Sequence, residues 1–268
     1  MPAGERRALG DYAAYLFDID GTLVYPERAV PGAAEALAAL RASGKAVLAV
    51  TNNSSLSRHD LGERFRSFGL PLEDSEVFSA LAATAQYIAH HSPGARVHVF
   101  GNPGLRVEIE RCGLVATDDV DVDYVVVGTH RGIDYERLTL AMRALLQGAR
   151  FVAVNVDRMY IGEDGGLIPA SGVFVAGLER AVGRGPDVVI GKPSVTLLHE
   201  AADSIEQPPA ECLFIGDNPE SDVVGAHAAG MDALLVLSGV ASAAEECTEP
   251  PEHILPSVAD LSRVMGAR

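Results

Sequence analysis

Two aspartates, Asp18 and Asp20, stand two residues apart directly after the apolar segment Tyr12–Phe17, and Gly21 and Thr22 follow them. Two like charges at this spacing repel each other unless a cation or a proton offsets them. In an extended segment residues two apart face the same side, and a glycine then permits a sharp turn. The pattern indicates a hard-metal site with a nucleophile beside it. An Asp-rich turn after a strand is the alternative, because Asp-x-Asp alone is a weak pattern.

Three further polar clusters lie just after short apolar runs. They read Thr51-Asn52-Asn53-Ser54, Gly191-Lys192-Pro193-Ser194 and Gly216-Asp217-Asn218-Pro219-Glu220-Ser221-Asp222. Each has a simpler interpretation, as a helix cap, a turn that opens a helix or a β-turn. Ligand sites in open α/β sheets form at the carboxyl ends of strands. Four such clusters together supply the nucleophile, the acid–base carboxyl, the cation ligands and the phosphate-binding donors that phosphoryl transfer needs.

The elements that must position these clusters are short apolar runs that alternate with helical patterns. The runs are rich in Val, Ile and Leu with little alternation, which is typical of strands buried on both faces of a parallel sheet. This order predicts an α/β fold with right-handed crossovers. The predicted strands are Tyr12–Phe17, Lys45–Val50, Arg96–Phe100, Tyr124–Val127, Phe151–Val154, Asp187–Ile190, Cys212–Ile215 and Ala233–Leu237. The predicted helices are Gly32–Ser43, Arg58–Phe68, Leu81–His91, Leu105–Arg111, Tyr135–Gln147, Gly172–Val182 and Val223–Ala229.

Length and charge narrow the possible partners. The chain has 268 residues, enough for one large domain or two modest ones, and its formal charge is −16. That charge opposes binding to nucleic acid or to anionic lipid surfaces. No apolar run approaches the roughly 18 residues of a membrane helix, and the segment Met1–Asp11 lacks the apolar core of a secretory signal. We therefore expect a cytoplasmic protein with no nucleic-acid or membrane partner.

The four clusters resemble the motifs of the haloacid dehalogenase superfamily of hydrolases. Asp18-Ile19-Asp20-Gly21-Thr22 matches its first motif, Asp-x-Asp-Gly-Thr, and Thr51 and Lys192 match the second and third. Asp217 and Asp222 match the acidic fourth motif. The residues around Thr51 and Lys192, together with Leu235–Val240, resemble those of the NagD-like, p-nitrophenylphosphatase-type branch. The resemblance implies a Rossmann-like parallel-sheet core with an inserted, smaller α/β cap domain.

The resemblance also implies a role for each matching residue. Asp18 would be the nucleophile, Asp20 the general acid and base, and Lys192 would neutralise charge beside Asp18. Thr51 and Asn52 would hold the phosphoryl group, and further substrate contacts would come from Gly21 and Asn53. A magnesium ion would be held by the side chains of Asp18 and Asp217 and by the main-chain carbonyl of Asp20, and Asp222 would support it through water or Lys192. Dehalogenases of the family lack the second aspartate, so Asp20 favours a phosphatase.

A cap domain would lie between the second and third motifs. The expected division is a core of residues 1–91 and 187–268 with a cap of residues 92–186. The cap loop of the branch, Asn-x-Asp followed by Pro-x-x-Gly, reads Asn155-Val156-Asp157 and Pro169-Ala170-Ser171-Gly172. It implies that Asn155 and Asp157 contact substrate. Val156 and Ala170 depart from the proline and glycine that the branch often has there, which puts the substrate in doubt and not the reaction.

The resulting expectation is a magnesium-dependent phosphatase of small metabolites that works through an aspartyl phosphate. Sugar phosphates, phosphoglycolate, glycerol phosphate, nucleoside monophosphates and aryl phosphates all suit a capped site. The alternatives are a phosphotransferase or mutase that uses the same intermediate, and a phosphate-ligand sensor without catalysis. Arg131 and Arg158 are interpreted as exposed loop arginines, although a guanidinium there could grip a substrate anion. The resemblance further implies a homodimer.

Overall fold

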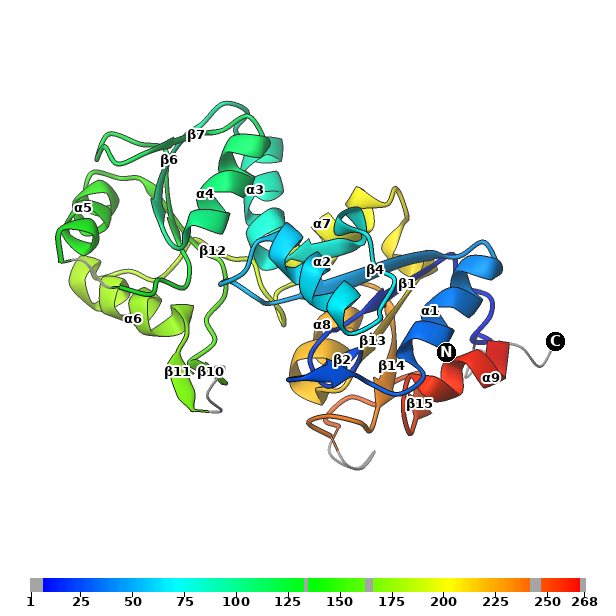
Figure 1. The fold of residues 1–268 in the computed structure, drawn as a ribbon. Helices are drawn as coiled ribbons and strands as arrows, with labels where there is room; N and C mark the ends of the chain where they lie inside the picture. Colours follow the sequence, from blue (N-terminus) through cyan, green and yellow to red (C-terminus); the bar gives the residue numbers. More distant parts are fainter. Residues whose placement is uncertain (1–6, 133–134, 162–165, 242–246, 266–268) are drawn as a thin grey trace. The chain divides into compact units, whose positions relative to one another are not determined.

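A computed structural model describes residues 7–132, 135–161, 166–241 and 247–265. The chain divides into two compact units, each built on a sheet with parallel strands (Figure 1). Unit 1 comprises Met1–Thr51, His59–Phe78 and Lys192–Arg268, and unit 2 comprises Asn52–Arg58 and Ser79–Gly191. The predicted α/β class is confirmed. Among the described residues, no helix has the length and apolar character needed to cross a membrane.

Unit 1 is built on a six-stranded sheet of order β15-β14-β13-β1-β4-β5. Its strands are β1 (Ala14–Phe17), β4 (Ala46–Thr51), β5 (Val77–Ser79), β13 (Cys212–Gly216), β14 (Asp232–Val236) and β15 (His253–Leu255). Its helices are α1 (Ala33–Ala42), α2 (Arg58–Ser67), α7 (Val195–Ser204), α8 (Val224–Ala228) and α9 (Ala259–Met265). The first residue of α2 and the last residue of β5 are grouped with unit 2.

The central strands of unit 1 bring three of the polar clusters to one edge. Every residue of β1 and β13 is buried, as expected for apolar strands covered on both faces. β1 pairs in parallel with both neighbours, and Phe17 lies opposite Ile215 of β13 and Ala49 of β4. The residues that follow these strands, Asp18 and Asp217, therefore leave the sheet at the same edge.

Unit 2 is built on a five-stranded sheet of order β12-β9-β8-β6-β7, in which the paired strands run parallel. The strands are β6 (Arg96–Phe100), β7 (Val115–Thr117), β8 (Tyr124–Val127), β9 (Arg150–Ala153) and β12 (Val188–Val189). The helices are α3 (Ala80–His91), α4 (Pro103–Arg111), α5 (Tyr135–Leu146) and α6 (Ser171–Val182), and β10 (Met159–Ile161) pairs antiparallel with β11 (Leu167–Pro169). Phe100, Phe151 and Phe174 lie in an apolar cluster between this sheet and α5 and α6.

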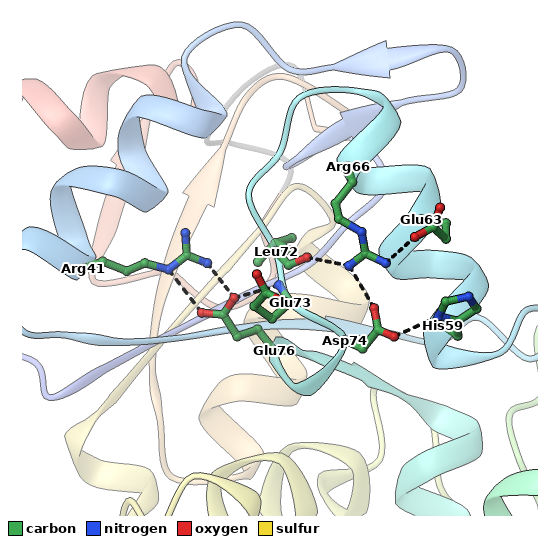
Figure 2. Close-up of polar contacts among 8 residues, drawn as sticks. All are labelled: Arg41, His59, Glu63, Arg66, Leu72, Glu73, Asp74 and Glu76. Carbon is green, nitrogen blue, oxygen red and sulfur yellow. Dashed lines mark hydrogen bonds and ion pairs between the residues drawn. The ribbon is translucent and has the colours of Figure 1, made fainter.

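Polar contacts fasten the segment between α2 and β5 within unit 1 (Figure 2). The Arg66 guanidinium donates to Asp74 over 2.9 Å and to the Leu72 carbonyl over 3.2 Å. Arg41 of α1 donates two hydrogen bonds, of 3.1 and 2.7 Å, to Glu76. Such bidentate pairs are geometrically specific. These hydrogen bonds fix α1 and α2 against the segment that leads into β5.

The predicted strands and helices all occur, β6 and β8 with the predicted bounds and most others with shifted ends, but the sequence patterns missed several further elements. Examples are the hairpin of β2 (Val24–Tyr25) and β3 (Arg28–Ala29), and the helix α7. The predicted helix Val223–Ala229 is α8, and a π-helical turn, Pro219–Val223, precedes it. The grouping by contacts places Asn52–Arg58 and α3 with unit 2, whereas the expected first segment ran to residue 91. The division into core and cap stays a prediction.

Candidate active site

Three aspartates from different parts of unit 1 gather at one point. Asp18 follows β1, Asp217 follows β13, and Asp222 belongs to the π-helical turn. One carboxylate oxygen from each lies within 4.8 Å of the other two. In the sequence, Asp18 is separated from Asp217 and Asp222 by about 200 residues, and the parallel pairing of β1 with β13 brings them together.

Lys192 places its ammonium among these carboxylates. Its side chain is buried, and Nζ donates to Asp18 Oδ1 over 2.5 Å and to Asp222 Oδ1 over 2.7 Å. Burial disfavours the charged amine, but the two carboxylates outweigh this effect and raise the pKa of Lys192. The amine therefore remains an ammonium and ties the first and fourth motifs together.

The Asp217 carboxylate is held by the backbone around it. Val240 donates its main-chain N–H to Asp217 Oδ2 over 2.6 Å. A β-carbon on Gly21 would lie 2.4 Å from the same oxygen, and one on Gly239 would lie 1.9 Å from it. Gly21 also has φ of +88°, a conformation that glycine adopts without strain. The two glycines leave the space that the carboxylate fills.

The turn after β1 differs from the expected extension of the strand. β1 ends at Phe17, and the Ile19 carbonyl accepts hydrogen bonds from the N–H groups of Thr22, Leu23 and Val24. The Ile19 carbonyl therefore organises a tight turn directly after the strand. Asp20 lies within this turn, and part of its surface is exposed.

The charges at this edge fit a hard divalent cation. Burial raises the pKa of Asp18 and of Asp217. The protein atoms around the partly exposed Asp20 likewise desolvate its carboxyl and raise its pKa, against the opposing effect of Arg64 and Lys192. The cluster contains three carboxylates and one ammonium, that of Lys192, so negative charge is in excess. Carboxylate oxygens are the ligands that hard cations such as magnesium prefer, so the donor set suits such an ion by both charge and atom type.

The second motif is divided between the two units. Thr51 is the last residue of β4 and is buried in unit 1, whereas Asn52 and Asn53 are grouped with unit 2. The Asn53 side-chain oxygen accepts from the N–H groups of Ser55 and Leu56 over 2.9 and 2.8 Å. Asn53 thus shapes its own loop, which is the usual behaviour of asparagine in turns.

Unit 2 brings Asn52 together with the predicted cap loop. Asn155 donates its side-chain amide to the Asn52 carbonyl over 2.7 Å, and Asn52 donates its own amide to Asp157 over 3.4 Å. Asn155 is 2% exposed, whereas Val156 and Arg158 are exposed. Arg131 is also exposed and donates to the Tyr160 hydroxyl over 3.3 Å.

Sequence reasoning overlooked two groups of residues around these positions. The hydroxyls of Ser54, Thr129 and Ser171 are buried together in unit 2. Ser54 and Ser171 stand inside the quoted motifs, but nothing in their spacing shows that they meet. Arg64 of α2 acts electrostatically on Asp20, and an arginine on a polar helix carries no signal of such a role.

Comparisons with known proteins agree with the motifs. Family models described as haloacid dehalogenase-like hydrolase and as HAD-hydrolase-like match residues 15–115 and 189–261. The 5'-nucleotidase YutF of Bacillus subtilis is 36% identical over 252 residues, which cover 93% of this chain and 97% of the relative. The ribonucleotide monophosphatase NagD of Escherichia coli K12 is 35% identical over 246 residues, which cover 91% and 96%.

Solved structures show the same likeness. The p-nitrophenyl phosphatase from Archaeoglobus fulgidus superimposes with a TM-score of 0.87 at 37% identity, over 94% of this chain and 99% of that one. The likeness extends over both units, since the matched share of each chain is nearly complete. Sequence and fold agree that the chain belongs to the haloacid dehalogenase-like hydrolases, in the branch of the NagD-type phosphatases.

Proposed function

We propose that the protein is a phosphatase that hydrolyses small phosphate monoesters through an aspartyl phosphate on Asp18. The observation that carries this proposal is the cluster of Asp18, Lys192, Asp217 and Asp222 at one sheet edge. Family membership gives the reaction class, and the cluster supplies charged groups suited to it.

In the first step, an Asp18 carboxylate oxygen attacks phosphorus, and the bond from phosphorus to the ester oxygen breaks. Asp20 gives a proton to the departing oxygen, which leaves as an alcohol. Its raised pKa suits a group that must carry this proton near neutral pH. Lys192 offsets the negative charge that gathers between Asp18 and the phosphoryl oxygens.

In the second step, water attacks the phosphorus of the aspartyl phosphate. Asp20 accepts a proton from that water, and the bond from phosphorus to Asp18 breaks. The products are inorganic phosphate and the regenerated carboxylate, so Asp20 also regains the proton that it gave in the first step. Thr51, Asn52 and the main chain at Gly21 are proposed to hold the phosphoryl oxygens throughout.

The proposed metal is magnesium. Asp18, Asp217 and Asp222 would hold it together with the main-chain carbonyl of Asp20, and when bound it would offset repulsion between the carboxylates and the phosphate oxygens. Asp222 also bonds to Lys192, so it would serve both the metal and the lysine.

The proposed substrates are small soluble metabolites, with unit 2 acting as the cap that selects among them. The names of the relatives point to nucleotides and to p-nitrophenyl phosphate for those proteins. In this chain Asn53 and Asp157 are the proposed contacts to the rest of the substrate. We propose a cytoplasmic enzyme that forms a homodimer and, with a formal charge of −16, does not bind nucleic acid.

Turnover of p-nitrophenyl phosphate with magnesium tests the proposal. Hydrolysis should release p-nitrophenol and inorganic phosphate in equal amounts, and Asp18→Asn should abolish both. A shortfall of phosphate in the presence of an added alcohol would instead indicate transfer to that acceptor. Absence of turnover, or turnover that survives Asp18→Asn, would exclude the proposed mechanism.

A further inference from the structure

A loop that carries part of the second motif is fastened into unit 2 by buried polar contacts. Asn102, the N-cap residue of α4, donates its side-chain amide to the Ser54 carbonyl over 2.5 Å. The Ser54 hydroxyl lies 2.5 Å from the Thr129 hydroxyl. Buried polar groups of this kind hold one geometry, because any displacement leaves a donor or acceptor without its partner.

The Ser171 hydroxyl connects this cluster to Asn155. It lies 3.3 Å from the Ser54 hydroxyl and donates to Asn155 Oδ1 over 2.5 Å. Ser171 is the first residue of α6 and is fully buried. Its contact with the oxygen of Asn155 decides which way that amide faces.

The orientation of the Asn155 amide determines which of its atoms faces Asn52. Its Oδ1 accepts from Ser171 and from the Asp157 N–H, at 3.3 Å, so its Nδ2 is directed to the Asn52 carbonyl at 2.7 Å. With 2% of its surface exposed and its oxygen shared by two donors, Asn155 is poorly placed to bind a leaving group.

Two glycines allow the segments to approach so closely. A β-carbon on Gly172 would lie 2.4 Å from the Val156 carbonyl oxygen. A β-carbon on Gly191 would lie 2.8 Å from Asn52 Oδ1 and 2.9 Å from Asn155 Cβ. The Asn52 side chain is therefore packed between the predicted cap loop and the residue that precedes Lys192.

We propose that Ser171 and Asn155 are positioning residues that set Asn52 for contact with the phosphoryl group. The inference rests on the proposed function, in which Asn52 binds the phosphoryl oxygens. It assigns Asn155 to the shared phosphate and not to the variable part of the substrate. Loss of either residue should therefore weaken binding of inorganic phosphate, the common product, as much as binding of any ester.

The test compares Ser171→Ala and Asn155→Asp with the wild-type enzyme. Ser171→Ala removes the donor to Asn155, and Asn155→Asp replaces the amide donor by an oxygen of the same shape. The inhibition constant of inorganic phosphate against p-nitrophenyl phosphate turnover should rise about 3- to 10-fold, as expected for one lost buried hydrogen bond. The kcat/KM values for p-nitrophenyl phosphate and for a nucleoside monophosphate should fall by the same factor.

A double-mutant cycle separates positioning from general damage. In the Asn52→Ala background, Ser171→Ala should add little further loss of phosphate inhibition, because the residue that it positions is already truncated. Ser92→Ala is the matched control: it removes a hydroxyl that lies 2.8 Å from the Tyr124 hydroxyl elsewhere in unit 2. It should leave phosphate inhibition unchanged.

Each outcome decides the proposal. Wild-type protein without turnover overturns the proposed function and, with it, the phosphate role of Asn52. Normal wild-type turnover with unchanged phosphate inhibition in both variants overturns the positioning role alone. A loss that differs between the two esters assigns Asn155 to the leaving group and also overturns it. If Ser171→Ala fails to fold, the isosteric Asn155→Asp decides the question by the same measurements.

Discussion

Asp217 Oδ2 occupies the space where a side chain on residue 239 would begin, since a β-carbon on Gly239 would lie 1.9 Å from it. Gly239 is itself exposed, and the three atoms nearest to such a β-carbon, at 1.9, 2.5 and 2.8 Å, all belong to Asp217. The methyl group would push the Asp217 carboxylate out of its place, and groups that orient a ligand affect metal affinity strongly. We expect Gly239→Ala to raise the magnesium concentration for half-maximal turnover about 10-fold or more.

Gly177→Ala is the control for that prediction. Gly177 lies in α6, and a β-carbon there would meet no atom within 4 Å. The change should leave the magnesium requirement unaltered and stabilise the helix by about 0.5–1 kcal/mol, measured by urea denaturation. An equal magnesium requirement for Gly239→Ala and wild type would contradict the packing argument.

Lys192→Met should impair both catalysis and the unliganded fold. It keeps the apolar stem but removes the ammonium that bonds to Asp18 and Asp222. We expect kcat/KM to fall at least about 100-fold. With magnesium chelated, the free energy of unfolding should fall by about 3–5 kcal/mol, because buried carboxylates then lose their counter-charge.

Lys45→Met is the matched control for the lysine. The Lys45 amine donates to the Tyr12 carbonyl over 2.7 Å and is not part of the aspartate cluster. Turnover should survive this change, with a loss of stability of about 1 kcal/mol. Equal turnover by the two lysine variants would show that the Lys192 charge is not needed.

The alkaline limit of activity should depend on Arg64. Desolvation raises the pKa of Asp20, and the Arg64 charge opposes this rise. Arg64→Gln should therefore raise the pKa of Asp20 further, so that the carboxyl keeps its proton to higher pH and the alkaline limb of kcat moves upward. Arg66→Gln, which removes a charge paired with Glu63 and Asp74, should leave that limb in place. A shift to lower pH in Arg64→Gln would oppose the assignment of Asp20 as the acid.

Stability should depend on pH through His227. Its Nδ1 lies 3.0 Å from Glu249 and its Nε2 lies 3.0 Å from Glu252, so both nitrogens donate only in the charged ring. Burial opposes the charge, but the two carboxylates prevail and raise the pKa of His227. The stabilisation is complete below the unfolded pKa, about 6.5, and is lost as pH rises through the folded-state pKa.

We therefore expect His227→Gln to lower the free energy of unfolding by about 1 kcal/mol near pH 5.5 and by less near pH 9. His59→Gln is the comparison, because His59 is exposed and pairs with Asp74 over 3.0 Å (Figure 2). Solvent screens that pair, so its loss should matter less at the lower pH. A larger effect for His59 would contradict the role of partial burial.

The sequence predicts most of what depends on local patterns. Apolar runs such as Cys212–Ile215 mark buried strands because both of their faces need covering. Parallel strands end at a common edge, so the sequence predicts that Asp18 and Asp217 lie at the same edge of the sheet, and the pairing of β1 with β13 makes them neighbours there. The short strands β2 and β3 escaped notice, since two-residue strands leave no periodicity to detect.

Contacts between distant side chains lie beyond the reach of the sequence. The turn at Ile19 depends on one carbonyl that serves three N–H groups, and main-chain bonding leaves no signature in residue type. Ser54 and Ser171 are 117 residues apart and meet through the tertiary fold of unit 2. Asn52–Arg58 likewise belongs to unit 2, in which Asn102 and Asn155, far along the chain, donate hydrogen bonds to the Ser54 and Asn52 carbonyls.

The grouping of Asn52–Arg58 with unit 2 determines which segments must be exchanged together when a chimaera of two relatives is built. Unit 2 consists of two stretches, Asn52–Arg58 and Ser79–Gly191. If the long stretch alone is transplanted, Asn102 and Asn155 come from the donor and the loop comes from the recipient. Their hydrogen bonds to the Ser54 and Asn52 carbonyls would then join segments of two different parents. A chimaera that carries both stretches keeps those bonds within one parent. The segment Asn52–Arg58, which contains part of the second motif, should therefore be taken from the same parent as the long stretch.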